Sequence, residues 1–220
     1  MEGKSWLDKL RRHFGSGAEE NALPAATPLR DLRIVVLDCE TTGLDKRRDA
    51  ILSVGALSVT GNVISTEDHF EGYVDTTPWQ GKGGASIIVH GILPRSKRYH
   101  YLSEPELLTN LSDYIGDSWI VGHHIGFDMD MIGRALEKHD LPPLKNRVVD
   151  TVRLAQRLRP SGYWSPPDDY TLDTLARRYR IPLSDRHTAL GDCYITAVLW
   201  LKLCARLAER IGRDLTVSDL

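Results

Sequence analysis

The chain has 220 residues, of which 41% are hydrophobic, and it carries 28 Lys and Arg against 30 Asp and Glu. This length and apolar content suffice for one domain with a full core. The formal net charge of -2 at pH 7 argues against a protein that wraps long nucleic acid by bulk electrostatics. Any anionic substrate would therefore have to be held locally.

The three cysteines, Cys39, Cys193 and Cys204, show no CxxC spacing. The sequence therefore predicts neither a zinc site nor a disulfide framework, and a reducing setting such as the cytoplasm is expected. No apolar run approaches the roughly 18 residues of a membrane span, and the N-terminus lacks the apolar core of a secretory signal.

The first 28 residues are predicted to form an amphipathic helix at residues 6–14, followed by a linker rich in Gly, Ala and Pro. The helix would either bind a partner or an anionic surface, or pack on its own domain, which is the commoner role of such helices. The domain itself is expected over residues 29–212, and residues 213–220 form a tail.

The first half of this domain is predicted to be rich in β-structure. Three strands are expected at residues 33–40, 50–60 and 62–74. Short connections, including the turn signal Thr60-Gly61-Asn62, favour antiparallel pairing. A Gly-rich loop follows at residues 80–92.

In the second half, helices alternate with strands, a pattern typical of parallel additions to one sheet. The expected elements are a helix at 104–116, a strand at 118–123, a helix at 127–140, a strand at 147–150 and a helix at 151–158. Beyond a loop at 161–170, a helix over 171–181 stops before Pro182. A last helix at 188–211 has apolar residues on both sides and is predicted to be largely buried.

Two carboxylates end the first strand, IVVLDCE. Residues two apart in a strand face the same way, so Asp38 and Glu40 project together. Like charges at the end of an apolar strand lose hydration that they cannot return to each other, and a cation would remove this penalty. Alternatively, one carboxylate caps a helix or pairs with Arg47 or Arg48 while the other lies in water. The spacing alone leaves both interpretations open.

Two further acids fit the first interpretation. Asp128 follows the strand IVGH at the start of a helix, where open α/β sheets bind their ligands. Asp192 lies inside the apolar last helix and needs a partner, either a metal or an Arg. Asp130 is expected on the surface of its helix.

His187 is five residues before Asp192, and this spacing separates the two side chains by about 140° on a regular helix. We therefore expect His187 in the preceding loop or first turn, leaning over the site that Asp192 approaches. Carboxylates without metal-spaced Cys or His favour Mg²⁺ or Mn²⁺. Four acids suit a two-metal site that cleaves phosphodiesters, with the histidine deprotonating the attacking water.

The segments DCETTGL, VGHHIGFD and HTALGD, in this order, resemble the three exonuclease motifs of the DEDDh 3′-to-5′ exonucleases. This DnaQ-like group includes the proofreading epsilon subunit of bacterial replicative polymerase. Segments at 88–92, 148–158 and 170–182 match as well, so the resemblance covers about residues 30–205. Three ordered motifs make chance agreement improbable.

The resemblance implies a role for each motif residue. The metal-binding acids would be Asp38, Glu40, Asp128 and Asp192, with His187 as the general base. Thr188 stands where the DEDDy branch has Tyr, which indicates the histidine branch. The implied nucleotide contacts are Thr41, Thr42, Gly43, Leu44, His90, His123, His124 and Phe127.

Two of these positions have a specific expectation. Leu44 would be an apolar wedge against the terminal bases. His124 stands where the family commonly has Asn, and unlike an amide it could charge below about pH 6.5.

The resemblance also implies a fold and an activity. The fold would be ribonuclease H-like, with a mixed sheet of five strands between helices. The activity would be Mg²⁺- or Mn²⁺-dependent release of 5′-mononucleotides from the 3′ ends of single-stranded or frayed DNA, in proofreading or repair.

Two alternatives remain. One is 3′-end trimming of RNA or short oligoribonucleotides, although that branch usually has Met where Thr41 stands. The other is an exonuclease-like module that binds a polymerase or repair partner.

Overall fold

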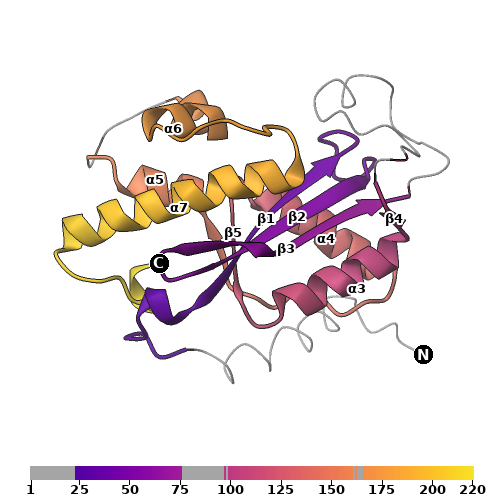
Figure 1. The fold of residues 1–220 in the computed structure, drawn as a ribbon, viewed down its shortest axis with the longest axis horizontal. Helices are drawn as coiled ribbons and strands as arrows, with labels where there is room; N and C mark the ends of the chain where they lie inside the picture. The colour runs from indigo at the N-terminus through magenta and orange to yellow at the C-terminus, as the bar shows by residue number, and fades with distance from the viewer. Residues whose placement is uncertain (1–22, 76–96, 98, 161, 163–165) are drawn as a thin grey trace, which may run out of the picture.

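The computed structural model describes residues 23–75, 97, 99–160, 162 and 166–220 (Figure 1). The helix predicted at 6–14, the Gly-rich loop at 80–92 and His90 lie outside the described residues.

The described part of the chain contains a mixed sheet of six strands in the order β4-β3-β2-β1-β5-β6. β1 pairs antiparallel with β2 and β2 antiparallel with β3, whereas β5 joins β1, β6 joins β5 and β4 joins β3 in parallel. The strands are β1 (Arg33–Thr41), β2 (Ile51–Thr60), β3 (Val63–Val74), β4 (Tyr101–Leu102), β5 (Trp119–Gly122) and β6 (Val148–Asp150).

The antiparallel half follows from local sequence signals. The predicted turn joins β2 to β3 through two residues, and Gly61 adopts a φ of 59° that its missing side chain allows. β2 lies between two neighbours and is buried along nearly all of its length, which matches its continuous apolar sequence.

The sixth strand is the one difference from the predicted sheet. Five strands were expected, and the structure adds β4, whose residues Tyr101 and Leu102 pair with Tyr73 and Val74 of β3. A strand of two residues is too short to show an alternating pattern, so the sequence carries no periodic signal for it.

Helices cover both faces of the sheet (Figure 1). Along β1, Ile34 and Val36 join the core beneath α5, α6 and α7, whereas Val35 and Leu37 join the core beneath α3 and α4. This alternation is the two-residue period of a strand buried on both faces. The helices are α3 (Glu104–Ile115), α4 (Gly126–Lys138), α5 (Thr151–Arg157), α6 (Leu172–Arg178) and α7 (Ala189–Ile211).

Two helices differ from the prediction. α6 ends at Arg178, earlier than expected, because Arg180 adopts a left-handed φ of 54° and breaks the helical repeat before Pro182. α7 packs mainly through one face, and Tyr194, assigned to an apolar side, is 48% exposed. None of the described helices combines the length and apolarity needed to cross a membrane.

The two ends of the described chain pack against each other. Leu29 donates its backbone N–H to Leu215, and Val217 donates to Thr27. Leu215 and Val217 are buried in the core beneath α7. In the structure the folded unit therefore extends beyond the predicted 29–212 into residues 24–28 and 213–220.

Candidate active site

Three carboxylates from two elements converge at the C-terminal end of β1. Asp38 and Glu40 come from β1 and Asp192 from the first turn of α7, and one oxygen of each lies within 4.8 Å of the others. The predicted common face of Asp38 and Glu40 is thus confirmed. Spacing along the chain gave no measure of their distance from Asp192.

Gly55 allows α7 to come this close to the sheet. It pairs with Asp38 across β1 and β2, and a Cβ placed on it would lie 2.5 Å from the backbone carbon of Ala189. The Cys193 thiol donates to the Gly55 carbonyl at 3.1 Å. A residue without a side chain is therefore required where the start of α7 crosses the strand.

Asp128 lies beside β1 in a different arrangement. It is 6% exposed in the first turn of α4, and its Oδ1 accepts the Cys39 backbone N–H at 3.0 Å. It is not one of the three acids whose oxygens converge, although its charge acts on Asp38. The expected exposure of Asp130 is confirmed, since its side chain is 58% exposed and pairs with Lys46.

The acids disfavour one another's ionised forms. Burial, followed by the charges of Asp128 and Asp192, raises the pKa of Asp38 well above its ordinary value. Burial and then the charge of Asp192 raise the pKa of Glu40 to about 8. Burial also raises the pKa of Asp128 to about 7 and that of Asp192 above its usual value. The cluster therefore favours a bound cation.

His187 lies just outside α7, as expected from its spacing. The helix begins at Ala189 with Thr188 as its N-cap, and His187 has a left-handed φ of 66°. Its backbone N–H donates to Asp192 Oδ1 at 3.4 Å. The turn thus holds the backbone of His187 next to the last acid of the site.

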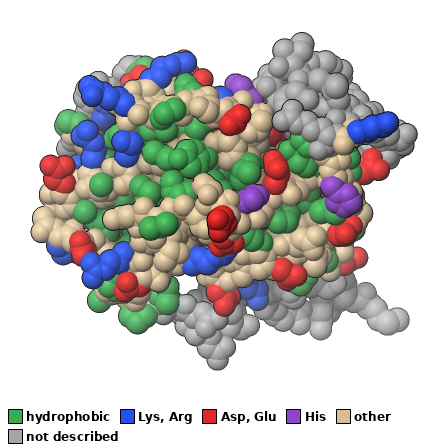
Figure 2. Space-filling model, in the orientation of Figure 1, with side chains coloured by type: hydrophobic (Ala, Val, Ile, Leu, Met, Phe, Trp, Pro, Cys, Tyr) green, Lys and Arg blue, Asp and Glu red, His purple; other side chains and the backbone are tan. Residues whose placement is uncertain are grey.

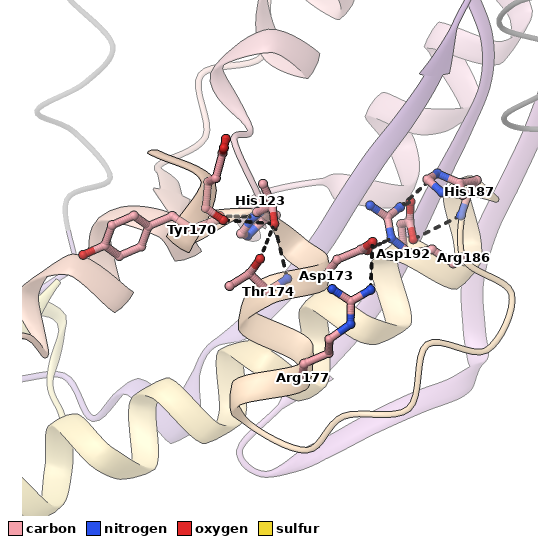
Figure 3. Close-up of polar contacts among 10 residues, drawn as sticks. His123, Tyr170, Asp173, Thr174, Arg177, Arg186, His187 and Asp192 are labelled. Atoms are coloured by element: carbon pink, nitrogen blue, oxygen red, sulfur yellow. Dashed lines mark hydrogen bonds and ion pairs between the residues drawn. The ribbon is translucent and has the colours of Figure 1, made fainter. Parts of the chain in front are cut away.

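The site contains an arginine that the sequence reasoning did not assign. Arg186 forms an ion pair through Nη1 with Asp192 Oδ2, and its Nε donates to Asp173 Oδ1 of α6 at 2.6 Å (Figure 3). The sequence indicated such a residue only indirectly, because Asp192 is an acid in an apolar helix and needs a metal or an Arg as its partner. The candidate arginines considered for the first acids, Arg47 and Arg48, form no ion pair with Asp38 or Glu40 among the described residues.

The segment after the first acids forms a loop organised by Asp49, a residue that the motif did not include. Asp49 accepts from the Thr42 hydroxyl at 2.8 Å and from the Asp45 backbone N–H at 2.8 Å. The Thr41 hydroxyl donates to the Gly43 carbonyl at 2.7 Å. These bonds present Leu44 to solvent with 86% of its surface exposed.

The two histidines before α4 lie in different environments. The ring nitrogens of His123 bond to the Thr151 hydroxyl and the Tyr170 carbonyl, each at 2.8 Å, and burial lowers its pKa to about 4. Both nitrogens are thus occupied by protein groups. His124 is exposed and has a φ of 55°, a left-handed conformation that Asn also tolerates well. Phe127 is half-buried, with Lys46 Nζ 5.8 Å from its ring centre.

A family model described as exonuclease, of the RNase T type, matches residues 35–199. The chain belongs to this exonuclease family. The resemblance found in the three motifs, to DnaQ-like DEDD exonucleases, is thereby confirmed.

Curated relatives of the exonuclease include the PolC-type DNA polymerase III of Latilactobacillus sakei subsp. sakei, 31% identical over 206 residues. That of Pediococcus pentosaceus is 31% identical over 186 residues. The aligned regions cover 88% and 84% of the chain. They span only 13% and 12% of the two relatives' lengths.

Solved structures share the fold of the exonuclease. Exonuclease I of E. coli in complex with a dT13 oligonucleotide aligns with a TM-score of 0.66 and 20% identity over 82% of this chain and 42% of that one. Exonuclease I from Methylocaldum szegediense aligns with a TM-score of 0.62 and 20% identity, covering 82% and 41%. At 20% sequence identity, this structural similarity supports the ribonuclease H-like fold and nothing beyond the fold.

The donor set of the exonuclease fits a divalent metal ion. Its ligands would be carboxylate oxygens, which hard cations such as Mg²⁺ and Mn²⁺ prefer. Burial is the main cause of the raised pKa values of Asp38, Glu40 and Asp192, and neighbouring carboxylates add to it; a bound cation would offset both effects. Asp128, which bonds to the Cys39 backbone of the same strand, would be the fourth candidate ligand.

These pKa shifts predict how stability depends on pH. The folded protein holds protons on Glu40 up to about pH 8, whereas the unfolded chain releases them near the ordinary value of 4.5. Metal-free protein should therefore lose stability as the pH rises through this window. Because metal binds the deprotonated acids, the gain in Tm on adding Mn²⁺ should grow from about pH 6 to about pH 9.

Thermal melts in EDTA and in Mn²⁺ across this range would measure the effect. Glu40→Gln is the control, since it removes one titrating group of the window and should make the decline in EDTA shallower. A Tm in EDTA that increases from about pH 6 to about pH 8 would contradict the prediction.

Proposed function

We propose that this exonuclease removes 5′-mononucleotides from the 3′ ends of single-stranded or frayed DNA, using two Mg²⁺ or Mn²⁺ ions. The observation that carries the proposal is the convergence of Asp38, Glu40 and Asp192 within 4.8 Å, beside His187. Such a cluster of hard ligands next to a histidine suits metal-assisted hydrolysis of a phosphodiester.

Each residue would have a distinct task. Asp38, Glu40 and Asp192 would hold the ions, with Asp128 completing the set. Bound ions would activate a water and stabilise the leaving oxygen. His187 would take the proton of that water, because no hydrogen bond among the described residues engages its Nε2.

The charge distribution supports local capture of the substrate. Acidic and histidine side chains gather on the right half of the face in Figure 2, and most Lys and Arg side chains lie on the left. With a net charge of -2, the chain has little bulk attraction for nucleic acid. Metal ions at the acidic cluster would provide the positive charge that a 3′-terminal phosphodiester requires.

A substrate panel tests the proposal. Purified protein would be incubated with single-stranded DNA, mismatched duplex and matched RNA in Mn²⁺, Mg²⁺ or EDTA. Each substrate is labelled at the 5′ end, and its 3′ end is either free or blocked. The expected result is stepwise shortening of unblocked DNA in either metal and none in EDTA. Faster RNA trimming would favour the alternative substrate, which depends on contacts to the 2′-hydroxyl. No degradation of any polymer in Mn²⁺ would refute the catalytic proposal.

Leu44 offers a sharper prediction about substrate binding. We propose that its exposed side chain packs against the terminal bases, held there by the loop that Asp49 organises. Leu44→Ser should raise KM for single-stranded DNA about tenfold, the scale of one apolar base contact. Hydrolysis of a p-nitrophenyl ester of thymidine monophosphate, which has no neighbouring base, should change little.

Val63→Ser is the matched control, because Val63 is also exposed, at 67%, but lies at the β2–β3 turn. Both variants should keep their Tm within a few degrees. Equal effects of Leu44→Ser on the oligonucleotide and the ester would argue against the wedge.

A polymerase partner is also proposed, since the curated relatives are polymerases many times longer than this chain. Binding would join the exonuclease to a synthesis or repair complex. Co-purification with and without residues 1–25 tests whether the predicted N-terminal helix mediates it.

A further inference from the structure

Arg186 is a partly buried cation at the edge of the candidate metal site. Its side chain is 23% exposed and lies between Asp173 of α6 and Asp192 of α7 (Figure 3). The planar guanidinium contacts one acid through Nε and the other through Nη1, and a flexible ammonium could not reproduce this fork. Arg186 therefore bridges two helices at the site.

The ion pair with Arg186 occupies one carboxylate oxygen of Asp192. Arg186 Nη1 bonds to Oδ2, and among the described residues the other oxygen accepts a single long bond of 3.4 Å, from the His187 backbone. Asp192 is also one of the three acids whose oxygens converge. A metal ion that takes this carboxylate must therefore meet the guanidinium at the same group.

The same guanidinium contacts His187. Arg186 Nη1 lies 3.3 Å from His187 Nδ1. Because a guanidinium can only donate, Nδ1 must accept and the proton of the neutral ring resides on Nε2. In this arrangement Nε2 carries the ring proton, so His187 can accept a proton from water there only after Arg186 Nη1 leaves Nδ1.

The turn before α7 directs Arg186 into the site. Asp185 and His187, on either side of it, have left-handed φ values of 55° and 66°. The Thr188 hydroxyl donates to the Asp185 carbonyl at 2.8 Å and accepts the Gly191 N–H at 3.1 Å. Strained residues persist only where their surroundings fix them, so the backbone of this turn, from which Arg186 extends, is fixed by the fold.

Asp173 is the second carboxylate that holds the guanidinium of Arg186. It is 35% exposed, and Arg186 Nε donates to it at 2.6 Å, so this contact can remain when the pair with Asp192 breaks. Among the described residues Arg177 also pairs with Asp173, with its Nη2 3.9 Å away and its side chain 69% exposed.

We propose that Arg186 is a built-in counter-cation that occupies Asp192 in the metal-free protein, competes with metal for it, and is held by Asp173 when metal displaces it. The inference rests on the proposed metal-dependent function and adds a residue that sets metal affinity. Because the two compete for one carboxylate, weakening the hold of Arg186 on Asp192 strengthens metal binding by up to the same factor.

Mn²⁺ binding to the full chain tests this directly. It is measured by titration calorimetry and by the electron paramagnetic resonance spectrum of free Mn²⁺. Arg186→Gln should bind Mn²⁺ about tenfold more tightly than wild type, within the usual range of coupling between two binding events. In EDTA this variant should melt at a lower temperature, because Asp192 loses its counter-charge. Arg186→Lys, which keeps the charge but cannot form the fork to both acids, should bind Mn²⁺ more tightly than wild type and less tightly than Arg186→Gln.

Asp173→Asn should act in the opposite direction and weaken Mn²⁺ binding, since the guanidinium loses the carboxylate that shares its charge with Asp192. The double variant should match Arg186→Gln alone, because Asp173 has no role once the arginine is gone. Arg177→Gln is the control and should leave Mn²⁺ binding unchanged.

Unchanged or weaker Mn²⁺ binding by Arg186→Gln would overturn the inference and make Arg186 a support for Asp192. If that variant does not fold, Asp173→Asn decides, and unchanged or tighter binding overturns the inference. Wild-type protein that binds no Mn²⁺ would refute the proposed metal-dependent function as well, so the two failures are distinguishable.

Discussion

Asp38→Asn is expected to lower exonuclease activity on the order of a thousandfold and at the same time raise the Tm of the metal-free protein. Activity falls because a candidate metal ligand is lost from the converging three. Stability rises because the carboxylate is buried beside Asp128, Asp192 and Glu40, and these charges make its ionised form unfavourable. The two effects have opposite signs, which loss of folding cannot imitate.

Nucleotide release in Mn²⁺ and thermal melts in EDTA at about pH 8 measure both effects. Asp130→Asn is the matched control, since Asp130 is an exposed acid that pairs with Lys46 outside the cluster. It should keep near-normal activity and Tm. Substantial activity in Asp38→Asn would show that another set of residues performs the reaction.

Gly55→Ala is expected to destabilise the protein by about 3 kcal/mol, the scale of an overpacked core. The added Cβ would lie 2.5 Å from the backbone of Ala189 and 2.6 Å from that of Leu190. Backbone atoms cannot rotate away as side chains can, so the start of α7 must shift from β2. Asp192 would move with it, and Mn²⁺ should bind more weakly.

Chemical denaturation and Mn²⁺ titration test this prediction. Gly133→Ala provides the control, because Gly133 is exposed within α4 and its Cβ would meet nothing within 4 Å. That change should stabilise the protein by up to about 1 kcal/mol through helix propensity. Equal stability of the two variants would mean that the close approach at Gly55 does not constrain the fold.

Much of the fold could be predicted because its signals are local. The antiparallel strands, the turn at Gly61 and the alternating helices follow from periodicity and turn chemistry. β4 could not be predicted, since two residues have no period. The packing of Leu215 and Val217 against the start of the domain was also hidden, because nothing in a short tail indicates what it contacts.

The candidate site, too, could be predicted from the sequence only in part. The spacing of Asp38 and Glu40 fixed their common face, and the spacing of His187 and Asp192 placed the histidine outside the helix. Arg186 and Asp49 went unassigned, because each acts through a loop conformation that has no repeat in the sequence.

By itself the sequence determined which chemical groups the protein has and which of them share a strand face or a helix turn, because the backbone repeats of 2 and about 3.6 residues are local. Only the tertiary structure decided that Asp192 meets Asp38 and Glu40, that Asp128 bonds to the Cys39 backbone, and that Arg186 shares the site. The first two of these contacts join elements far apart in the chain. The approach of Asp192 to β1 also depends on how closely α7 packs on β2, which the contact at Gly55 sets.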